Sequence, residues 1–262
     1  MAGGTGVRAE RQGAIAVWTI DRPDRFNALS RAAVRELGRL AREASLDRSL
    51  RAVILTGVGD KAFCAGADLK ERQRMDEDDV RDFLPLYRAS FEAIDRLPVP
   101  VFAAINGVAF GGGLELALAC DFRIAAGHAQ LGLTETSLGI IPGAGGTQRL
   151  TRIVGEAVAK ELIVFARRLT ASEAKELGVI HRVAPDGTSA LRAALEWAKP
   201  LEDAAPIAIG AALDAIDGAS ELPLEAGLTL ERRCYERTLA SQDRLEALAA
   251  FAEKRKPRFE GR

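Results

Sequence analysis

Two glutamates, Glu115 and Glu135, lie beside glycine-rich segments in otherwise apolar parts of the chain. Glu115 directly follows three consecutive glycines and sits in the apolar run 114–120, and Glu135 precedes the glycine-rich segment 139–146. An ionisable group is costly to bury without a purpose. Two carboxylates in one apolar crevice push each other's pKa values apart, which leaves one ionised as a base and one protonated as an acid. That pair is suited to adding or removing water.

Two loops offer backbone N–H groups near these glutamates. In residues 63–70, Gly66 allows a tight turn and Asp68 can cap a helix that begins at Leu69. In residues 106–115 the three glycines precede a helix, so exposed backbone meets the positive end of the helix dipole. One N–H from each loop would form an oxyanion hole, in which a single donor is typically worth about 3 kcal/mol.

Each of these features also has an ordinary structural interpretation. Glu115 could face solvent from its helix, and Glu135 could belong to the cap of a short helix at Thr134. Either loop taken alone is more typical of common turn chemistry, because three glycines lack the spacing of nucleotide-binding loops. The functional interpretation gains weight only when the two loops are taken together.

The elements that must position these residues alternate between strand and helix. Residues 14–20, 51–56 and 99–105 are typical of strands, the last two buried, and Ser30 is placed to cap an amphipathic helix. Repetition of strand, loop and helix predicts a parallel sheet whose loops gather at the carboxyl ends of the strands. Beyond about residue 185 the pattern becomes helical, over residues 189–198, 206–216, 224–238 and 243–254.

Composition limits the possible classes of function. The 262 residues are 48% hydrophobic and 28% charged, with a formal net charge of −1, so no global field favours nucleic acid or an anionic membrane. The two histidines, His128 and His181, lie far apart, which disfavours a zinc site or a histidine triad, and we expect no metal. The uncharged stretch 97–114 contains prolines and glycines and predicts a buried strand and loop rather than a membrane span.

The cysteines and the N-terminal segment indicate a compartment. Cys64, Cys120 and Cys234 are an odd number at wide spacing, which favours reduced thiols that pack rather than react. Residues 1–13 contain no apolar core of the kind that a signal peptide needs. We therefore expect a cytoplasmic protein.

Four strings in the sequence closely resemble the enoyl-CoA hydratase (crotonase) family, in family order across nearly the whole chain. They are residues 63–70 (FCAGADLK), 111–117 (GGGLELA), 140–149 (IIPGAGGTQR) and 250–255 (AFAEKR). The resemblance implies an α/β fold, with a spiral of ββα units in residues 1–188 and a C-terminal helical trimerisation region in residues 189–262. It also implies a homotrimer or a hexamer made of two trimers.

The resemblance assigns roles to the residues of both loops. It implies that the N–H groups of Ala67 and Gly112 hold the thioester oxygen. Glu115 would activate the water that attacks the β-carbon, Glu135 would deliver a proton to the α-carbon, and the N–H of Gly143 would help to hold the water. Because isomerases of the family typically keep a carboxylate only at the position of Glu135, hydration is the favoured reaction.

Coenzyme A enters as part of the acyl-CoA substrate, and no prosthetic group is expected. The resemblance implies contacts from residues around the first loop and from the C-terminal end of a neighbouring subunit. Arg25 is an expected phosphate partner because Asp24 stands where the family usually has lysine. The full set of expected contacts is Arg25, Ala65, Ala67, Leu69 and Lys70, with Phe251 and Lys254 from the neighbour.

A narrower similarity is to methylglutaconyl-CoA hydratases of leucine breakdown, over residues 67–72, 113–121 and 241–246. Their acidic acyl group would need a basic partner, for which Arg72, Arg74 and Arg81 are candidates. A short-chain enoyl-CoA hydratase or isomerase of fatty acid oxidation is the alternative.

A function of another class is RNA binding. It is motivated by Arg31, Arg35, Arg39 and Arg42 on one predicted helix. Acidic residues interleave with these arginines and aromatic residues are scarce, so the pattern favours a solvated helix face.

Overall fold

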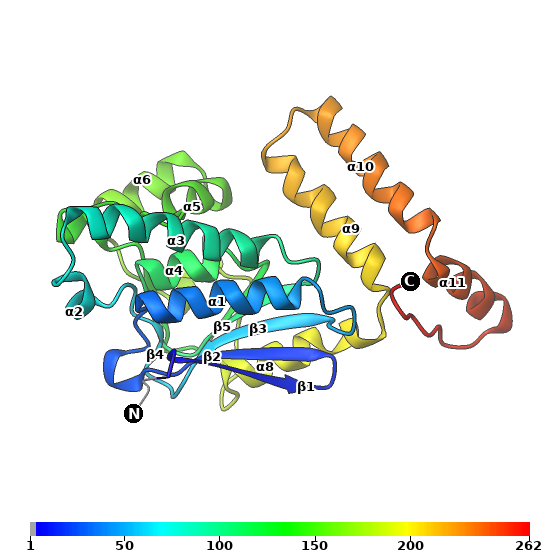
Figure 1. Cartoon of the computed structure of the whole chain (residues 1–262), viewed down its shortest axis with the longest axis horizontal. Helices are drawn as coiled ribbons and strands as arrows, with labels where there is room; N and C mark the ends of the chain where they lie inside the picture. Colours follow the sequence, from blue (N-terminus) through cyan, green and yellow to red (C-terminus); the bar gives the residue numbers. More distant parts are fainter. Residues whose placement is uncertain (1–3) are drawn as a thin grey trace.

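Two β-sheets and the helices around them make up the computed structural model, which describes residues 4–262 (Figure 1). The first three residues of the N-terminal segment, for which the sequence predicts no leader, lie outside this range. The larger sheet has the strand order β1-β2-β3-β5-β7-β10. Its strands are β1 (Val7–Gln12), β2 (Ile15–Ile20), β3 (Ala52–Gly57), β5 (Val101–Ile105), β7 (Phe122–Ala125) and β10 (Arg182–Val183).

The larger sheet is parallel from β2 to β10, which confirms the parallel sheet predicted from the sequence. Strands β2, β3 and β5 fall within or next to the predicted segments 14–20, 51–56 and 99–105. Strand β1 pairs antiparallel with β2 and was not predicted. Only Val7 of its residues is buried, so β1 has almost no hydrophobic signal.

The smaller sheet consists of short strands in the order β4-β6-β8-β9. They are β4 (Ala62–Cys64), β6 (Val108–Phe110), β8 (Gln130–Gly132) and β9 (Leu169–Thr170). Three times, a strand of the larger sheet is followed by a strand of the smaller sheet and then by helix. The helical segments after these strand pairs are α2 (Leu69–Arg72) and α3 (Glu77–Asp95), then α4 (Gly112–Leu118), then η2 (Glu135–Leu138) and α5 (Gly146–Val154). The repeating ββα unit is therefore present.

Helices cover both faces of the larger sheet. Side chains alternate between the faces of a strand, so Leu55 of β3 packs in the same cluster as residues of α1 (Arg31–Ala44) and α3, whereas Ile54 packs with α8 (Ala190–Ala198). Ser30 caps α1, as predicted. The remaining short elements are η1 (Pro23–Arg25), α6 (Glu156–Val164), α7 (Ala171–Glu176), η3 (Lys199–Asp203) and η4 (Gly218–Ser220).

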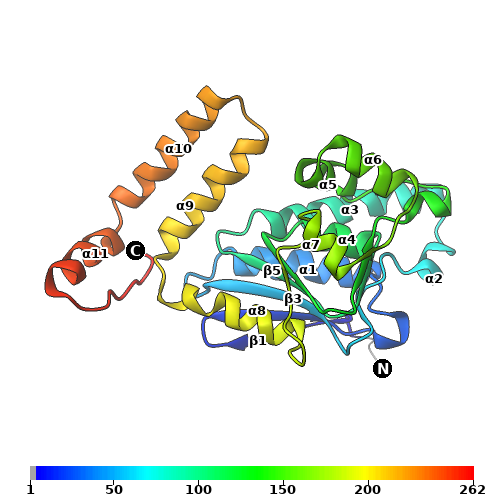
Figure 2. The same cartoon turned by 180° about the vertical axis from the view of Figure 1, so that it is seen from behind.

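Three C-terminal helices form an arm that projects from the sheets (Figures 1 and 2). They are α9 (Pro206–Asp217), α10 (Leu224–Leu239) and α11 (Gln242–Glu253), and with α8 they match the predicted helical segments. Helix α8 follows the expected boundary at residues 188/189 but packs on the larger sheet. The arm exposes large apolar side chains: Ile216, Leu222, Leu224, Leu228, Tyr235, Leu239, Leu245, Leu248 and Phe251.

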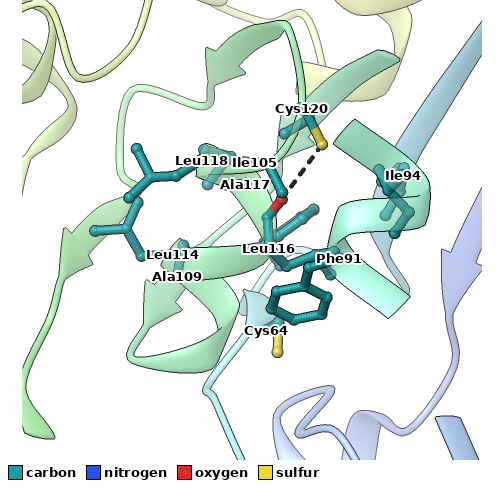
Figure 3. Packing of buried hydrophobic residues seen from close by; sticks show 14 of the residues in the cluster. Cys64, Phe91, Ile94, Ile105, Ala109, Leu114, Leu116, Ala117, Leu118 and Cys120 are labelled. Carbon is teal, nitrogen blue, oxygen red and sulfur yellow. Dashed lines mark hydrogen bonds between the residues drawn. The ribbon is translucent and has the colours of Figure 1, made fainter. Parts of the chain in front are cut away.

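Apolar residues of helix α4 belong to the main hydrophobic cluster, where Leu116 packs near Phe91 of α3 (Figure 3). Cys64 and Cys120 belong to the same cluster, and all three cysteines are free and buried. Burial raises the pKa of the Cys64 thiol to about 12, so the thiol is protonated at neutral pH. The predicted packing role of Cys64 is consistent with this environment.

Across residues 4–262, no helix has the length and apolar character needed to cross a membrane. The uncharged stretch 97–114 instead contains β5, β6 and the first turn of α4, as expected.

The third glycine of the loop before α4 allows the helix to approach strand β4. A Cβ atom at Gly113 would lie 2.9 Å from Cys64 Cβ and closer still to the Cys64 carbonyl, whereas one at Gly127 would meet nothing within 4 Å. We expect Gly113→Ala to lower the free energy of unfolding by about 1–3 kcal/mol through overpacking. The control Gly127→Ala should stay within about 0.5 kcal/mol. Urea unfolding followed by circular dichroism measures both, and equal losses would contradict the assignment.

Candidate active site

The first loop is fixed on both sides by hydrogen bonds. Leu29 N donates to Gly66 O at 2.7 Å and Asp68 N donates to Leu29 O at 3.0 Å, which leaves the N–H of Ala67 outside this pairing. Asp68 caps α2, as predicted, by accepting from the N–H groups of Lys70 and Glu71. Gly66 has φ of +100°, a conformation that favours glycine.

Arg22 holds this loop and was not identified from the sequence. Its Nη2 donates to Asp68 Oδ2 at 2.6 Å and its Nη1 donates to Ala28 O at 2.5 Å. Asp68 is only 8% exposed, so the ion pair is shielded from water, and the Arg22 guanidinium helps to lower the pKa of Asp68 against the effect of burial. Arg22 lies far from Asp68 in the sequence, so no local spacing of residues predicts that the two form an ion pair.

The second loop brings another N–H beside that of Ala67. Gly111 has φ of +51° and ψ of −125°, which only glycine adopts readily, and it precedes α4. The N–H of Gly112 is in the first turn of α4 and has no partner within the helix. A Cβ atom at Gly112 would lie 3.8 Å from Ala67 N, and one at Gly66 would lie 3.5 Å from Gly112 N. The two predicted oxyanion-hole donors are therefore adjacent.

Glu115 is buried in the first turn of α4, with 3% of its surface exposed. Its Oε1 accepts from Ala144 N at 2.7 Å and from Gly146 N at 2.8 Å. Burial raises the pKa of Glu115, and the N–H groups of Gly146, Ala144 and Gly143 oppose that rise. The alternative of a solvent-facing Glu115 is thus wrong.

Glu135 lies in η2 on the other side of the second loop. A Cβ atom at Gly111 would lie 3.1 Å from Glu135 Oε1. The side chain is 8% exposed, and its Oε2 accepts no hydrogen bond from the described residues 4–262. Burial, followed by the charge of Glu115, raises the pKa of Glu135 to about 7. The two carboxyl groups therefore lie in different environments, because Glu115 Oε1 accepts two backbone N–H groups and Glu135 Oε2 accepts none from the described residues.

The amides of Ala144 and Gly146 were also not identified from the sequence. Residues 143–146 precede α5, and Gly146 is its first helical residue. A glycine-rich loop at a helix N-terminus is the same signal that marked the second loop, so the loop that binds Glu115 could have been found in the same way. The expected contact of Gly143 N–H with a water stays a prediction.

The residues expected to contact coenzyme A lie in two separate regions of the structure. Arg25 and Lys70 line one cavity of about 440 Å³ next to the first loop, together with Arg22, Arg31 and Arg74. Ala65 and Leu69 lie two residues before and after Ala67, the predicted oxyanion-hole donor. Phe251 and the C-cap residue Lys254 belong to α11 in the arm, at the opposite end of the molecule from α2 (Figure 2). Their expected contact with a neighbouring subunit stays a prediction.

Comparison with known proteins shows the family to which the chain belongs. Residues 10–262 match the sequence profile described as Enoyl-CoA hydratase/isomerase. The mitochondrial methylglutaconyl-CoA hydratase of Rattus norvegicus is 46% identical over 255 residues, covering 96% of this chain and 81% of that protein. An enoyl-CoA isomerase/hydratase of Mycosarcoma maydis is 47% identical over 251 residues, covering 93% of this chain and 91% of that protein.

A solved structure agrees with the sequence relatives. The crystal structure of an enoyl-CoA hydratase from Bacillus anthracis has a TM-score of 0.95 and 46% identity, covering 98% of this chain and all (100%) of that one. The predicted crotonase-type α/β fold is therefore confirmed. The protein belongs to the enoyl-CoA hydratase/isomerase family.

Proposed function

We propose that the protein is a hydro-lyase that adds water, reversibly and syn, to the double bond of a 2-enoyl-CoA thioester. One observation carries the proposal: the carboxyl groups of Glu115 and Glu135 adjoin the glycine-rich second loop, whose N–H at Gly112 is adjacent to that of Ala67. Two carboxyl groups beside two backbone amide donors are the groups that water addition to a thioester requires.

The reaction can be written with these groups alone. The thioester oxygen accepts hydrogen bonds from the N–H groups of Ala67 and Gly112. Glu115 removes a proton from water as the water oxygen bonds to the β-carbon, and the electrons of the double bond move to the thioester oxygen as an enolate. Glu135 then gives its proton to the α-carbon, and the proton on Glu115 passes to Glu135, so both carboxyl groups return to their starting states. The net change is one hydroxyl on the β-carbon and one hydrogen on the α-carbon.

The environments of the two carboxyl groups support this division of labour. Glu115 accepts two backbone N–H groups, which favour its ionised form and suit a base. Glu135 has a buried Oε2 that accepts no hydrogen bond from residues 4–262 and a pKa raised to about 7, which suits an acid. The family's isomerases typically keep a carboxylate only at the position of Glu135, so the presence of Glu115 favours hydration.

Binding of the coenzyme A moiety and assembly are part of the proposal. Arg25 and Lys70 supply positive charge to the cavity beside the first loop, where phosphates would form charge-assisted hydrogen bonds. Phe251, at 87% exposed, and Lys254 would reach the nucleotide of a neighbouring subunit. The large apolar side chains exposed on α9, α10 and α11 support a trimer or a dimer of trimers, because such patches usually pack against protein.

We further propose an acidic branched acyl group, such as that of methylglutaconyl-CoA in leucine degradation. Support comes from the rat relative, which is named a methylglutaconyl-CoA hydratase. Among the candidate partners for the acyl carboxylate, Arg74 lines the cavity assigned above to the phosphates, which lie at the other end of coenzyme A from the acyl group, and this disfavours it. Arg81 is bound to Glu77 and Asp78 on an exposed turn of α3, which disfavours it as well.

RNA binding is the alternative of another class, and the charges on α1 disfavour it. Arg39 forms ion pairs with Glu36 and Glu43 on the same helix. A positive track for phosphates needs unpaired basic residues, so α1 better fits a solvated face.

Substrate preference separates the proposed activity from its enzymatic alternatives. Hydration can be monitored by the loss of the ultraviolet absorbance of the conjugated thioester. We expect kcat/KM to be at least about tenfold higher for 3-methylglutaconyl-CoA than for crotonyl-CoA, because a paired substrate carboxylate adds about 1.4 kcal/mol or more of transition-state binding. A preference for crotonyl-CoA would assign the protein to short straight chains. Turnover of 3-enoyl-CoA without hydration would make it an isomerase.

Removal of either carboxylate should abolish most activity without unfolding the protein. Glu115→Gln and Glu135→Gln should each lower kcat by at least about a hundredfold, the scale of general acid-base catalysis. Glu176→Gln on the exposed surface of α7 is the control and should leave kcat unchanged. Circular dichroism checks folding, and a near-normal rate in either active-site variant would refute the assignment.

The pH dependence follows from the raised pKa of Glu135. Hydration needs the protonated acid, which is present below a pKa of about 7 and lost above it, so kcat/KM should fall as the pH rises through about 7. On the acidic side, the rate should fall again as Glu115 gains a proton. Because the two groups interact, both apparent pKa values belong to the pair. A rate independent of pH between about 6 and 9 would contradict this scheme.

A further inference from the structure

Arg149 lies behind the loop that holds Glu115 and is not part of the catalytic scheme above. It is the fourth residue of α5, and its side chain is 22% exposed. Its Nη2 donates to Asp95 Oδ2 of α3 at 2.8 Å, and its Nη1 donates to Ala144 O at 3.2 Å. The guanidinium thus ties the loop to α3.

The contacts of Ala144 connect Arg149 to the carboxylate. The N–H of Ala144 donates to Glu115 Oε1 at 2.7 Å, and its carbonyl accepts from Arg149. Gly145 has φ of +106°, and a Cβ atom there would collide with Arg149 Nη1, so the glycine lets the guanidinium fold over the loop. A turn of the backbone at Ala144 and Gly145 would move both amides that bind Glu115.

Arg149 also supplies the positive charge near Glu115. The other titratable groups around that carboxylate are Glu135 of η2 and Tyr87 of α3, and Tyr87 also interacts with Cys64 of β4. Burial raises the pKa of Tyr87 and of Cys64, so both are neutral at pH 7. The pKa of Glu115 is raised first by burial, and the Arg149 charge acts with the backbone N–H groups to lower it.

We propose that Arg149 is a positioning residue that fixes the Ala144–Gly146 amides against α3 and so favours the ionised form of Glu115 over the protonated one. The inference rests on the proposed hydration activity, since it assigns Arg149 to the same site. Arg149 itself touches neither the water nor the acyl chain in this scheme. Its loss should therefore change the protonation of Glu115. It should also change kcat more than it changes KM.

The test is the pH profile of kcat and kcat/KM for crotonyl-CoA hydration in charge-changing variants. Arg149→Met and Arg149→Gln remove the charge, Arg149→Lys keeps it, and Arg152→Met is the matched control because Arg152 is exposed on the same helix. Both neutral variants should move the acidic limb of kcat/KM upward by about 0.5–1 pH unit, the expected scale for a nearby cation. Arg149→Lys should restore the limb, and Arg152→Met should match the parent protein, with KM within about twofold throughout.

Several outcomes would overturn the inference. One is an acidic limb in Arg149→Met and Arg149→Gln that superimposes on that of the parent protein. Another is failure of both neutral variants to fold, judged by circular dichroism, while Arg149→Lys folds, because the residue would then be purely structural. If the parent protein does not hydrate crotonyl-CoA or methylglutaconyl-CoA at all, the proposed function fails instead. If it hydrates and Glu115→Gln is inactive while the Arg149 variants behave like the parent, only this inference fails.

Discussion

Burial of Glu115 beside Glu135 is the constraint that the rest of the site must satisfy. A carboxylate that is 3% exposed loses most of its hydration, and a second carboxyl group nearby adds repulsion. The N–H groups of Ala144 and Gly146 replace water for Glu115, and Glu135 responds with a raised pKa. The two carboxyl groups are therefore held in different environments, and acid-base chemistry at a single water needs such a difference.

The fold provides these amides by repeating one unit. Strands β3, β5 and β7 of the larger sheet each pass into a short strand of the smaller sheet and then into helix, so glycine-rich turns from different repeats meet. Gly111 and Gly113 are required where the second loop approaches Glu135 and Cys64. The Arg22–Asp68 ion pair fixes the first loop, and Arg149 binds the segment 143–146 through Ala144 O. Rigid support of this kind keeps amide donors aimed where charge develops.

The sequence predicts the parts of this arrangement that have local signals. Periodicity and turn chemistry are local, so they predict the buried strands β3 and β5, the cap residues Ser30 and Asp68, and the glycine-rich loops. Strand β1 could not be predicted from a hydrophobic pattern, because only Val7 of its residues is buried. The contacts of Arg22 with Asp68 and of Ala144 with Glu115 could not be predicted, because the partners lie 46 and 29 residues apart in the sequence. Family resemblance, rather than spacing, assigned the separate roles of the two glutamates.

The stereochemistry of hydration in D2O tests most directly whether the two carboxyl groups act together on one water. Crotonyl-CoA hydrated in D2O and analysed by NMR should carry one deuterium at the α-carbon, on the same face as the new hydroxyl group. That result requires the acid and the base to approach from one side, where Glu115 and Glu135 adjoin Gly111 and Gly112. Deuterium on the opposite face, or exchange at the γ-carbon without hydration, would contradict the account.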